Sequence, residues 1–313
     1  MPGLSFLKRH WQMLVAVLGV VLAAVLLYRI FRDYSLDDLV AAVAAVPGIR
    51  LAAAGGFAAA SYLLLTGFDH LALRYVGRPL PWRQAATASF VSLSIGHNVG
   101  FAGLSSGAIR YRFYRRWGLE AGDIVKLVMF CGVTVALGLA GLAGILLTAK
   151  PDLAGNLFGI GDGPAFAVGV AALALVALYL AACTGLRRRV RVRGVELALP
   201  PLRLAAAQTG IGVANFLCVA ACLHQALSGV AEVAFVQSAV AYVAANIGVL
   251  VTHAPGGLGV IESVVRHLVS GADVIGAVLV FRFVYFLVPL ALGGATFAVA
   301  EAVFRRSPSP RAA

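Results

Sequence analysis

The chain has 313 residues, of which 61% are hydrophobic and 12% are charged. A soluble domain cannot hide that much apolar side-chain area, so the composition excludes a soluble enzyme or a soluble binding module. The formal net charge of +12 would indicate nucleic acid in a soluble protein. Here the arginines lie in short segments between apolar runs, where the positive-inside rule places them and where anionic lipid headgroups could meet them. We therefore expect an all-α polytopic membrane protein whose partners are membrane lipids rather than nucleic acid.

The chain begins with a basic segment followed by an apolar run. Lys8, Arg9 and His10 precede apolar sequence over 11–27. This run is too long for a signal peptide and lacks a clear small-residue cleavage site, so we expect a retained first span.

Eight strongly apolar segments lie at about 12–30, 51–68, 85–109, 124–148, 164–184, 205–227, 235–270 and 274–301. About 20 such residues are enough for a helix to cross a bilayer. The third and seventh segments differ from the others because they contain polar, glycine-rich sequence in their middle. We expect about six full spans plus two re-entrant helical hairpins in one transmembrane domain over 1–306, followed by a disordered tail over 307–313.

The distribution of basic residues favours re-entrance of the two interrupted segments. With both segments re-entrant and both termini cytoplasmic, 19 of the 25 lysines and arginines lie on the inner side. If segment 85–109 crossed alone, the arginines over 110–116 would lie opposite those over 74–83, which the positive-inside rule disfavours. The first hairpin then enters from the cytoplasm, and the second enters from the outside.

The two interrupted segments resemble each other weakly. The three residues from Asn98 match the three from Asn246 apart from one Val-to-Ile difference, and each stretch precedes a glycine-containing break. Each break is followed by a charged residue, Arg110 or Glu262. Weak similarity with opposite orientation is typical of the inverted repeats that build transporter sites. Chance similarity in an Ala/Gly-rich sequence explains the match equally well.

The first interruption predicts an anion-binding site. Its candidate substrate-binding residues are polar, small or basic: Asn98, Ser105, Ser106, Gly107, Arg110, Tyr111 and Arg112. We expect a break over 103–107 that opens a helix, with Ser105 and Ser106 as its caps. Arg110 and Arg112 follow, and guanidinium groups hold phosphate with two donors. An aromatic and basic anchor at the membrane surface is an equally good interpretation of these residues.

The second interruption is sharper. Its candidate residues, together with one arginine of the last span, are His253, Pro255, Gly256, Gly257, Gly259, Glu262 and Arg282. Proline and three nearby glycines cannot continue a helix. Glu262 needs a partner in an apolar zone, and we expect Arg282 to be that partner. His253 is compatible with a proton-coupled step, although a structural histidine is more common. Pro289 predicts a kink in the last span.

Catalytic chemistry has few candidates in this sequence. A phosphate-binding loop, a zinc-protease motif and a nucleophile elbow are all missing from it. The scattered acid–base candidates are Asp69, His70, His97 and His253. We expect Asp69 and His70 at the solvated inner end of a span. Cys218 and Cys222 share a helix face and His224 follows them, but a zinc site would need further ligands at nearby depth and none is evident, so we expect neither a metal site nor a cofactor.

Residues at both interruptions resemble a known family. The stretch over 69–81, the three residues from Asn98 and the stretch from Gly107 to Tyr114 are similar to the transmembrane region of lysylphosphatidylglycerol synthases. That group includes the multiple peptide resistance factor and the shorter UPF0104 membrane proteins. The stretch from His253 to Glu262 resembles the family's Pro-Gly-Gly-x-Gly-x-x-Glu turn. The resemblance implies a flippase-like fold with two opposed re-entrant hairpins in a bacterial plasma membrane. The full synthases continue into a soluble aminoacyl-transferase domain, whereas this sequence stops just after the last span, so we expect no lysine transfer.

These features predict a lipid translocase or lipid-binding membrane protein that acts on an anionic phospholipid or a related lipid, and not an enzyme. Two alternatives stay open. One is an integral-membrane enzyme that modifies a lipid, and the other is an accessory scaffold for lipid-synthesis enzymes. We expect a multi-pass protein of the bacterial inner membrane with both termini cytoplasmic, which could also assemble with copies of itself.

Overall fold

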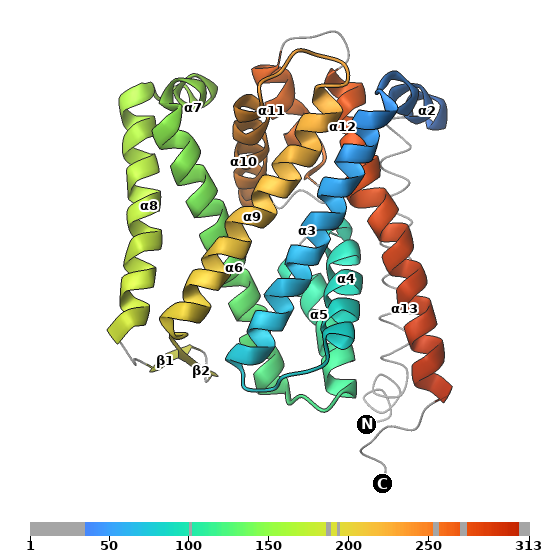
Figure 1. Ribbon diagram of the computed structural model, residues 1–313, viewed down its shortest axis with the longest axis vertical. Helices are drawn as coiled ribbons and strands as arrows, with labels where there is room; N and C mark the ends of the chain where they lie inside the picture. Colours follow the sequence, from blue (N-terminus) through green and yellow to red (C-terminus); the bar gives the residue numbers. More distant parts are fainter. Residues whose placement is uncertain are drawn as a thin grey trace, which may run out of the picture.

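A computed structural model describes residues 35–99, 102–185, 189–192, 195–252, 257–269 and 274–306. These residues form a bundle of helices with one small β-hairpin (Figure 1). In chain order the elements are α2 (Leu36–Ala45), α3 (Gly48–Tyr75), α4 (Trp82–Val99), α5 (Ala102–Arg116), α6 (Ala121–Ala149), α7 (Pro151–Phe158), α8 (Asp162–Gly185), β1 (Arg189–Val192), β2 (Val195–Ala198), α9 (Leu202–Leu227), α10 (Phe235–Thr252), α11 (Val260–Leu268), α12 (Val274–Arg282), the π-helix η2 (Phe283–Leu287) and α13 (Val288–Arg306).

Six helical segments of the described chain are long and apolar enough to cross a membrane: Gly48–Tyr75, Ala121–Ala149, Asp162–Gly185, Leu202–Leu227, Phe235–Thr252 and Val274–Phe304. The prediction of an all-α polytopic membrane protein is confirmed. The set differs from the six predicted spans in one member. The predicted span over 12–30 lies outside the described residues, and α10, the first arm of the second hairpin, qualifies by its length and composition.

The two interrupted segments form helical hairpins at opposite ends of the bundle. Helices α4 and α5 pack along each other in the lower part of Figure 1, whereas α10 and α11 do so in the upper part. Each hairpin lies between two spans in the chain: α3 and α6 flank the first, and α9 and the span Val274–Phe304, which begins with α12, flank the second. The helices α3 to α6 and the helices α9 to α12 therefore form two similar units, and the two units run in opposite directions in Figure 1, which is the arrangement of an inverted repeat.

The helix break of the first hairpin was predicted in the wrong place. Helix α5 begins at Ala102 and runs without interruption through the segment 103–107, so Ser105 and Ser106 do not cap it. Close packing explains the small residues there. A Cβ atom added at Gly96 of α4 would lie 2.9 Å from the Cβ of Ser106, so larger side chains at this crossing would separate α4 from α5.

Hydroxyl groups allow the polar helix α4 to lie inside the bundle. Ser89 is buried and donates to the carbonyl oxygen of Leu65 at 2.9 Å. Ser92 and Ser94 are also buried, and they donate to carbonyl oxygens within α4 at 3.0 and 3.3 Å. Because each of these hydroxyls has an acceptor, the burial of a polar helix leaves them satisfied.

The basic connections gather at one end of the bundle. The turns between α3 and α4 and between α5 and α6, the β1–β2 hairpin and the end of α13 all lie at the bottom of Figure 1. The two strands pair antiparallel, with Arg189 opposite Ala198 and Val192 opposite Val195. This grouping agrees with the side that the charge count predicts to be the inner one.

Helices α6 and α9 cross at two glycines, and this crossing predicts a stability effect. A Cβ atom added at Gly138 would lie 2.5 Å from the carbonyl carbon of Gly212. We expect Gly138→Ala to lower the free energy of unfolding by about 1–3 kcal/mol, because the two backbones must move apart. Unfolding in mixed detergent micelles measures the change. The matched control is Gly132→Ala on the same helix, where an added Cβ meets nothing within 4 Å; equal losses in both variants would contradict the prediction.

Candidate functional site

A buried ion pair fixes the first hairpin to α3. The Nε atom of Arg110 donates to both carboxylate oxygens of Asp69, at 3.1 and 3.0 Å, and an Nη atom donates to Oδ1 at 2.7 Å. The Arg110 side chain is 3% exposed and that of Asp69 is 0% exposed. The prediction that Asp69 is solvated was therefore wrong. Asp69 lies four residues after Leu65 and four before Leu73, so it belongs to the buried face of α3.

Two further donors reach the same carboxylate. The hydroxyl group of Tyr114 donates to Oδ2 of Asp69 at 2.7 Å, and the thiol of Cys131 lies 3.5 Å from Oδ1. Tyr114 follows Arg110 by one helical turn on α5, and Cys131 belongs to α6. The carboxylate therefore draws α3, α5 and α6 together and retains hydrogen-bond donors that do not depend on Arg110.

A second buried ion pair lies in the other hairpin. Arg282 at the end of α12 donates from Nε to Oε1 of Glu262 at 2.7 Å, and from an Nη atom to Oε2 at 3.0 Å. The Arg282 side chain is 3% exposed and that of Glu262 is 13% exposed. The predicted pairing of these two residues is confirmed.

The glycine-rich turn that precedes α11 contributes backbone groups to the second pair. Arg282 also donates to the carbonyl oxygen of Gly257 at 2.9 Å, and the Gly259 N–H donates to Oε2 of Glu262 at 2.9 Å. Gly257 and Gly259 have φ values of 64° and 79°, a region that side-chain-bearing residues rarely adopt. The other predicted residues of this turn, His253, Pro255 and Gly256, lie outside the described residues.

The two ion pairs are related like the hairpins that carry them. In each case the second arm of the hairpin contributes one charge, Arg110 or Glu262, and a neighbouring span contributes the opposite charge, Asp69 of α3 or Arg282 of the span Val274–Phe304. Each site is neutral as a pair and lies within apolar packing. A buried ion pair is weak evidence of a stabilising role, because the free-energy cost of removing two charges from water often exceeds their attraction, and well-packed apolar side chains in their place are often equally stable. The two pairs are therefore candidates for a functional role.

The remaining predicted residues of the first hairpin lie toward the basic end of the bundle or near the tip of the hairpin. Arg112 pairs with Glu301 of α13 through two donors. Tyr111 is 42% exposed, with the guanidinium of Arg115 5.9 Å from its ring centroid, which agrees with a membrane-surface anchor. Near the tip, the hydroxyl of Ser105 contacts the carbonyl oxygen of Gly96 at 3.4 Å. The structure thus separates Arg112 from Arg110 instead of placing both at one phosphate site.

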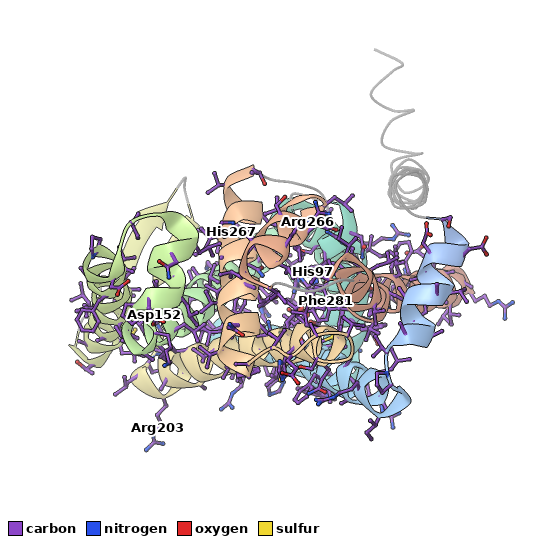
Figure 2. The ribbon with its side chains drawn as sticks, turned by 90° about the horizontal axis from the view of Figure 1, so that it is seen from above. His97, Asp152, Arg203, Arg266, His267 and Phe281 are labelled. Carbon is purple, nitrogen blue, oxygen red and sulfur yellow. The ribbon has the colours of Figure 1, made fainter. Side chains whose placement is uncertain are left out.

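A central polar cluster was missed by sequence reasoning. It consists of the buried residues Ser61, Asn215 and Tyr285, in which the Ser61 hydroxyl is hydrogen-bonded to each of the other two, with His97 beside them. Figure 2 shows His97 and Phe281 near the middle of the bundle seen from above, with Arg203 at its margin. Ser, Asn and Tyr occur singly in apolar helices of this sequence, so a spacing argument had no pattern to detect.

The described ranges hold no group of three or more His, Cys, Asp or Glu side chains that could bind a metal ion. Of the acid–base candidates, Asp69 is occupied by Arg110 and Tyr114, and His70 packs edge-on against Trp82 at 5.5 Å between ring centroids. The Nδ1 atoms of His70 and His97 are buried without a hydrogen-bond partner among the described residues.

Comparisons with known proteins cover both hairpins. A family model described as the lysylphosphatidylglycerol synthase TM region matches residues 16–293. The protein slr0712 of Synechocystis sp. (strain ATCC 27184 / PCC 6803 / Kazusa) is 29% identical over 263 residues, which cover 83% of this chain and 82% of that protein. Inner membrane protein YbhN of Escherichia coli (strain K12) is 30% identical over 275 residues, which cover 85% of this chain and 80% of that protein.

Proposed function

The chain belongs to the lysylphosphatidylglycerol synthase transmembrane-region family, and on that premise we propose that it translocates a lipid with an anionic headgroup. The six apolar helices and the inner-membrane relative support a location in a bacterial inner membrane. We assign the basic end of the bundle to the cytoplasm on the positive-inside rule. Both termini are proposed to lie on that side, since basic residues also precede the predicted first span.

One observation carries the proposal: hairpins inserted from opposite ends each contribute one residue to a buried arginine–carboxylate pair, Arg110 in the first hairpin and Glu262 in the second. A lipid headgroup that crosses a bilayer loses its hydration, and a phosphate group then needs charged donors inside the protein. Arginine supplies such donors in a planar fork that matches two phosphate oxygens. Arg110 serves the route from the basic end, and Arg282 serves the route from the other end.

The carboxylates make exchange of partners physically feasible. When Arg110 turns to a headgroup, Asp69 keeps the donor of Tyr114, which lies 2.7 Å away, and the thiol of Cys131. When Arg282 does the same, Glu262 keeps the Gly259 N–H at 2.9 Å. Each carboxylate therefore avoids the full cost of a buried charge without any partner. The resting pairs close the site to other anions, because an entering anion must displace a carboxylate.

We propose transport rather than catalysis for a related reason. Asp69 is the most deeply buried acidic residue of the described part of the chain and is a candidate general base. Its carboxylate already accepts hydrogen bonds from Arg110 and Tyr114. A general base needs a free lone pair within reach of the proton that it abstracts.

Membrane lipids are the proposed partners, and nucleic acid has no part in this proposal.

Reconstitution into liposomes tests the proposed function. Purified protein is expected to accelerate movement of fluorescent phosphatidylglycerol between leaflets, measured by chemical quenching of the outer-leaflet dye. Phosphatidylcholine with the same dye is the matched control, and it is expected to move more slowly because the arginines repel its quaternary ammonium group. If phosphatidylglycerol moves no faster than in protein-free liposomes, the proposal is wrong.

A further inference from the structure

A hydrogen-bonded polar cluster lies at the middle of the bundle, between the two hairpins. The hydroxyl of Ser61 donates to Oδ1 of Asn215 at 2.7 Å and lies 3.0 Å from the hydroxyl of Tyr285. The exposed fractions of these residues are 0%, 5% and 4%. Ser61 lies halfway along α3, and Asn215 lies halfway along α9. Both helices are spans, so the cluster lies near the centre of the membrane.

The π-helix η2 adds backbone carbonyl groups to this cluster. Pro289 has no N–H, so it cannot donate to the carbonyl oxygen of Tyr285 four residues earlier. That oxygen instead lies 3.4 Å from the hydroxyl of Tyr62, and the carbonyl oxygen of Phe286 lies 3.4 Å from Nδ2 of Asn98. The predicted distortion by Pro289 thus takes the form of a π-helix, a feature that is frequent at functional sites. It begins directly after Arg282 and so connects the cluster to the second ion pair.

His97 completes the cluster from the tip of the first hairpin. Its ring stacks against that of Tyr285, with centroids 6.4 Å apart and planes at 20°, and lies 6.5 Å from that of Tyr62. Its Nδ1 atom is buried and has no hydrogen-bond partner within the part of the chain that the structure describes. A buried polar atom without a partner costs free energy and calls for an occupant or a function.

The position of His97 links the two arginines. It lies on α4, which packs against the α5 helix that carries Arg110, and its ring partner Tyr285 follows Arg282 by three residues. A headgroup that passed from one arginine to the other would cross the cluster in between. An imidazole Nδ1–H at this point is a donor that adds no fixed charge to the membrane interior.

We infer that His97 contacts the substrate midway along the pathway, where its Nδ1–H donates a hydrogen bond to a phosphate-type oxygen. This inference rests on the proposed translocation of an anionic lipid and adds the residue that holds the headgroup between the two ion pairs. A lipid phosphodiester and free inorganic phosphate present the same oxygen, so the experiment must separate these two sources.

Two substitutions distinguish substrate contact from ring packing. His97→Phe keeps a ring against Tyr285 and removes the donor, whereas His97→Asn removes the ring and keeps an amide N–H near the position of Nδ1. We expect His97→Phe to slow phosphatidylglycerol movement in liposomes by about tenfold, and His97→Asn to stay within about threefold of the wild type. A packing role predicts the reverse order, and that order would overturn the inference.

Nuclear magnetic resonance reads occupancy without requiring transport. The whole chain is labelled with 15N-histidine in phosphatidylcholine nanodiscs, and the His97 signal is identified by its loss in His97→Asn. Phosphatidylglycerol is expected to shift this signal, and inorganic phosphate is not. A shift with inorganic phosphate alone would overturn the lipid as the source, and a signal unmoved by both would overturn the site. If the wild-type protein does not move lipid in liposomes, the proposed function is wrong. The titration would still show whether phosphatidylglycerol binds at His97, because it does not depend on transport.

Discussion

Replacing Arg110 with methionine is expected to lower the free energy of unfolding by about 3–5 kcal/mol. The substitution leaves the carboxylate of Asp69 buried without its cationic partner, at a position with 0% exposure. Tyr114 and Cys131 still donate to this carboxylate, but neutral donors do not replace a charge. Unfolding by sodium dodecyl sulfate in mixed micelles, followed by tryptophan fluorescence, measures the loss.

A second variant separates lost packing from lost charge balance. Asp69→Asn/Arg110→Met removes both charges and keeps an oxygen that accepts from the hydroxyl of Tyr114. We expect this double variant to recover about half or more of the stability lost by Arg110→Met, because no uncompensated charge stays buried. A double variant that is as unstable as the sum of its single variants would show that the two residues are not coupled, contrary to the geometry.

Glu262→Gln in the second hairpin is expected to cost about 2–3 kcal/mol of unfolding free energy. The loss is smaller than for the first pair because Glu262 is 13% exposed and Arg282 keeps the carbonyl oxygen of Gly257. Glutamine also retains an oxygen for the Gly259 N–H. Hydrogen exchange is expected to rise in α11, whose first turn Glu262 holds against α12.

The matched control for this prediction is Glu232→Gln, which neutralises an exposed carboxylate in the connection between α9 and α10. We expect a change within about 0.5 kcal/mol there, as at other surface sites. If Glu262→Gln and Glu232→Gln have the same small effect, the second ion pair contributes nothing to the hairpin.

The two ion pairs show what a sequence can and cannot predict. Glu262 and Arg282 each interrupt apolar sequence, so each needed a partner, and their pairing followed from that need. Asp69 lies beside His70 and shortly before Arg74, so it resembled a solvated helix end. Ser61, Leu65 and Asp69 follow one another at intervals of four residues, and this helical spacing was the signal that could have placed Asp69 on the buried face of α3.

The topology could be predicted from the sequence for a different reason. Basic residues distribute by side of the membrane, so counting them tested the two hairpins without knowledge of any contact. Local interruptions were less informative, because glycine and serine serve close helix packing as well as helix ends. For this reason the helix break was wrongly predicted at 103–107, where the small residues serve the close packing of Gly96 against Ser106. The polar cluster around His97 depends on residues from four elements and had no local signature.

The transbilayer rate of phosphatidylglycerol in liposomes that contain the Asp69→Asn/Arg110→Met variant tests the central claim most directly. The matched control is Arg78→Gln/Asp123→Asn, which removes a more exposed ion pair of 3.2 Å at the basic end. With folded protein confirmed in both samples, we predict that the buried-pair variant slows lipid movement by about tenfold or more while the control keeps the wild-type rate. Lipid movement at the wild-type rate in the buried-pair variant would contradict a role for Arg110 in carrying the headgroup.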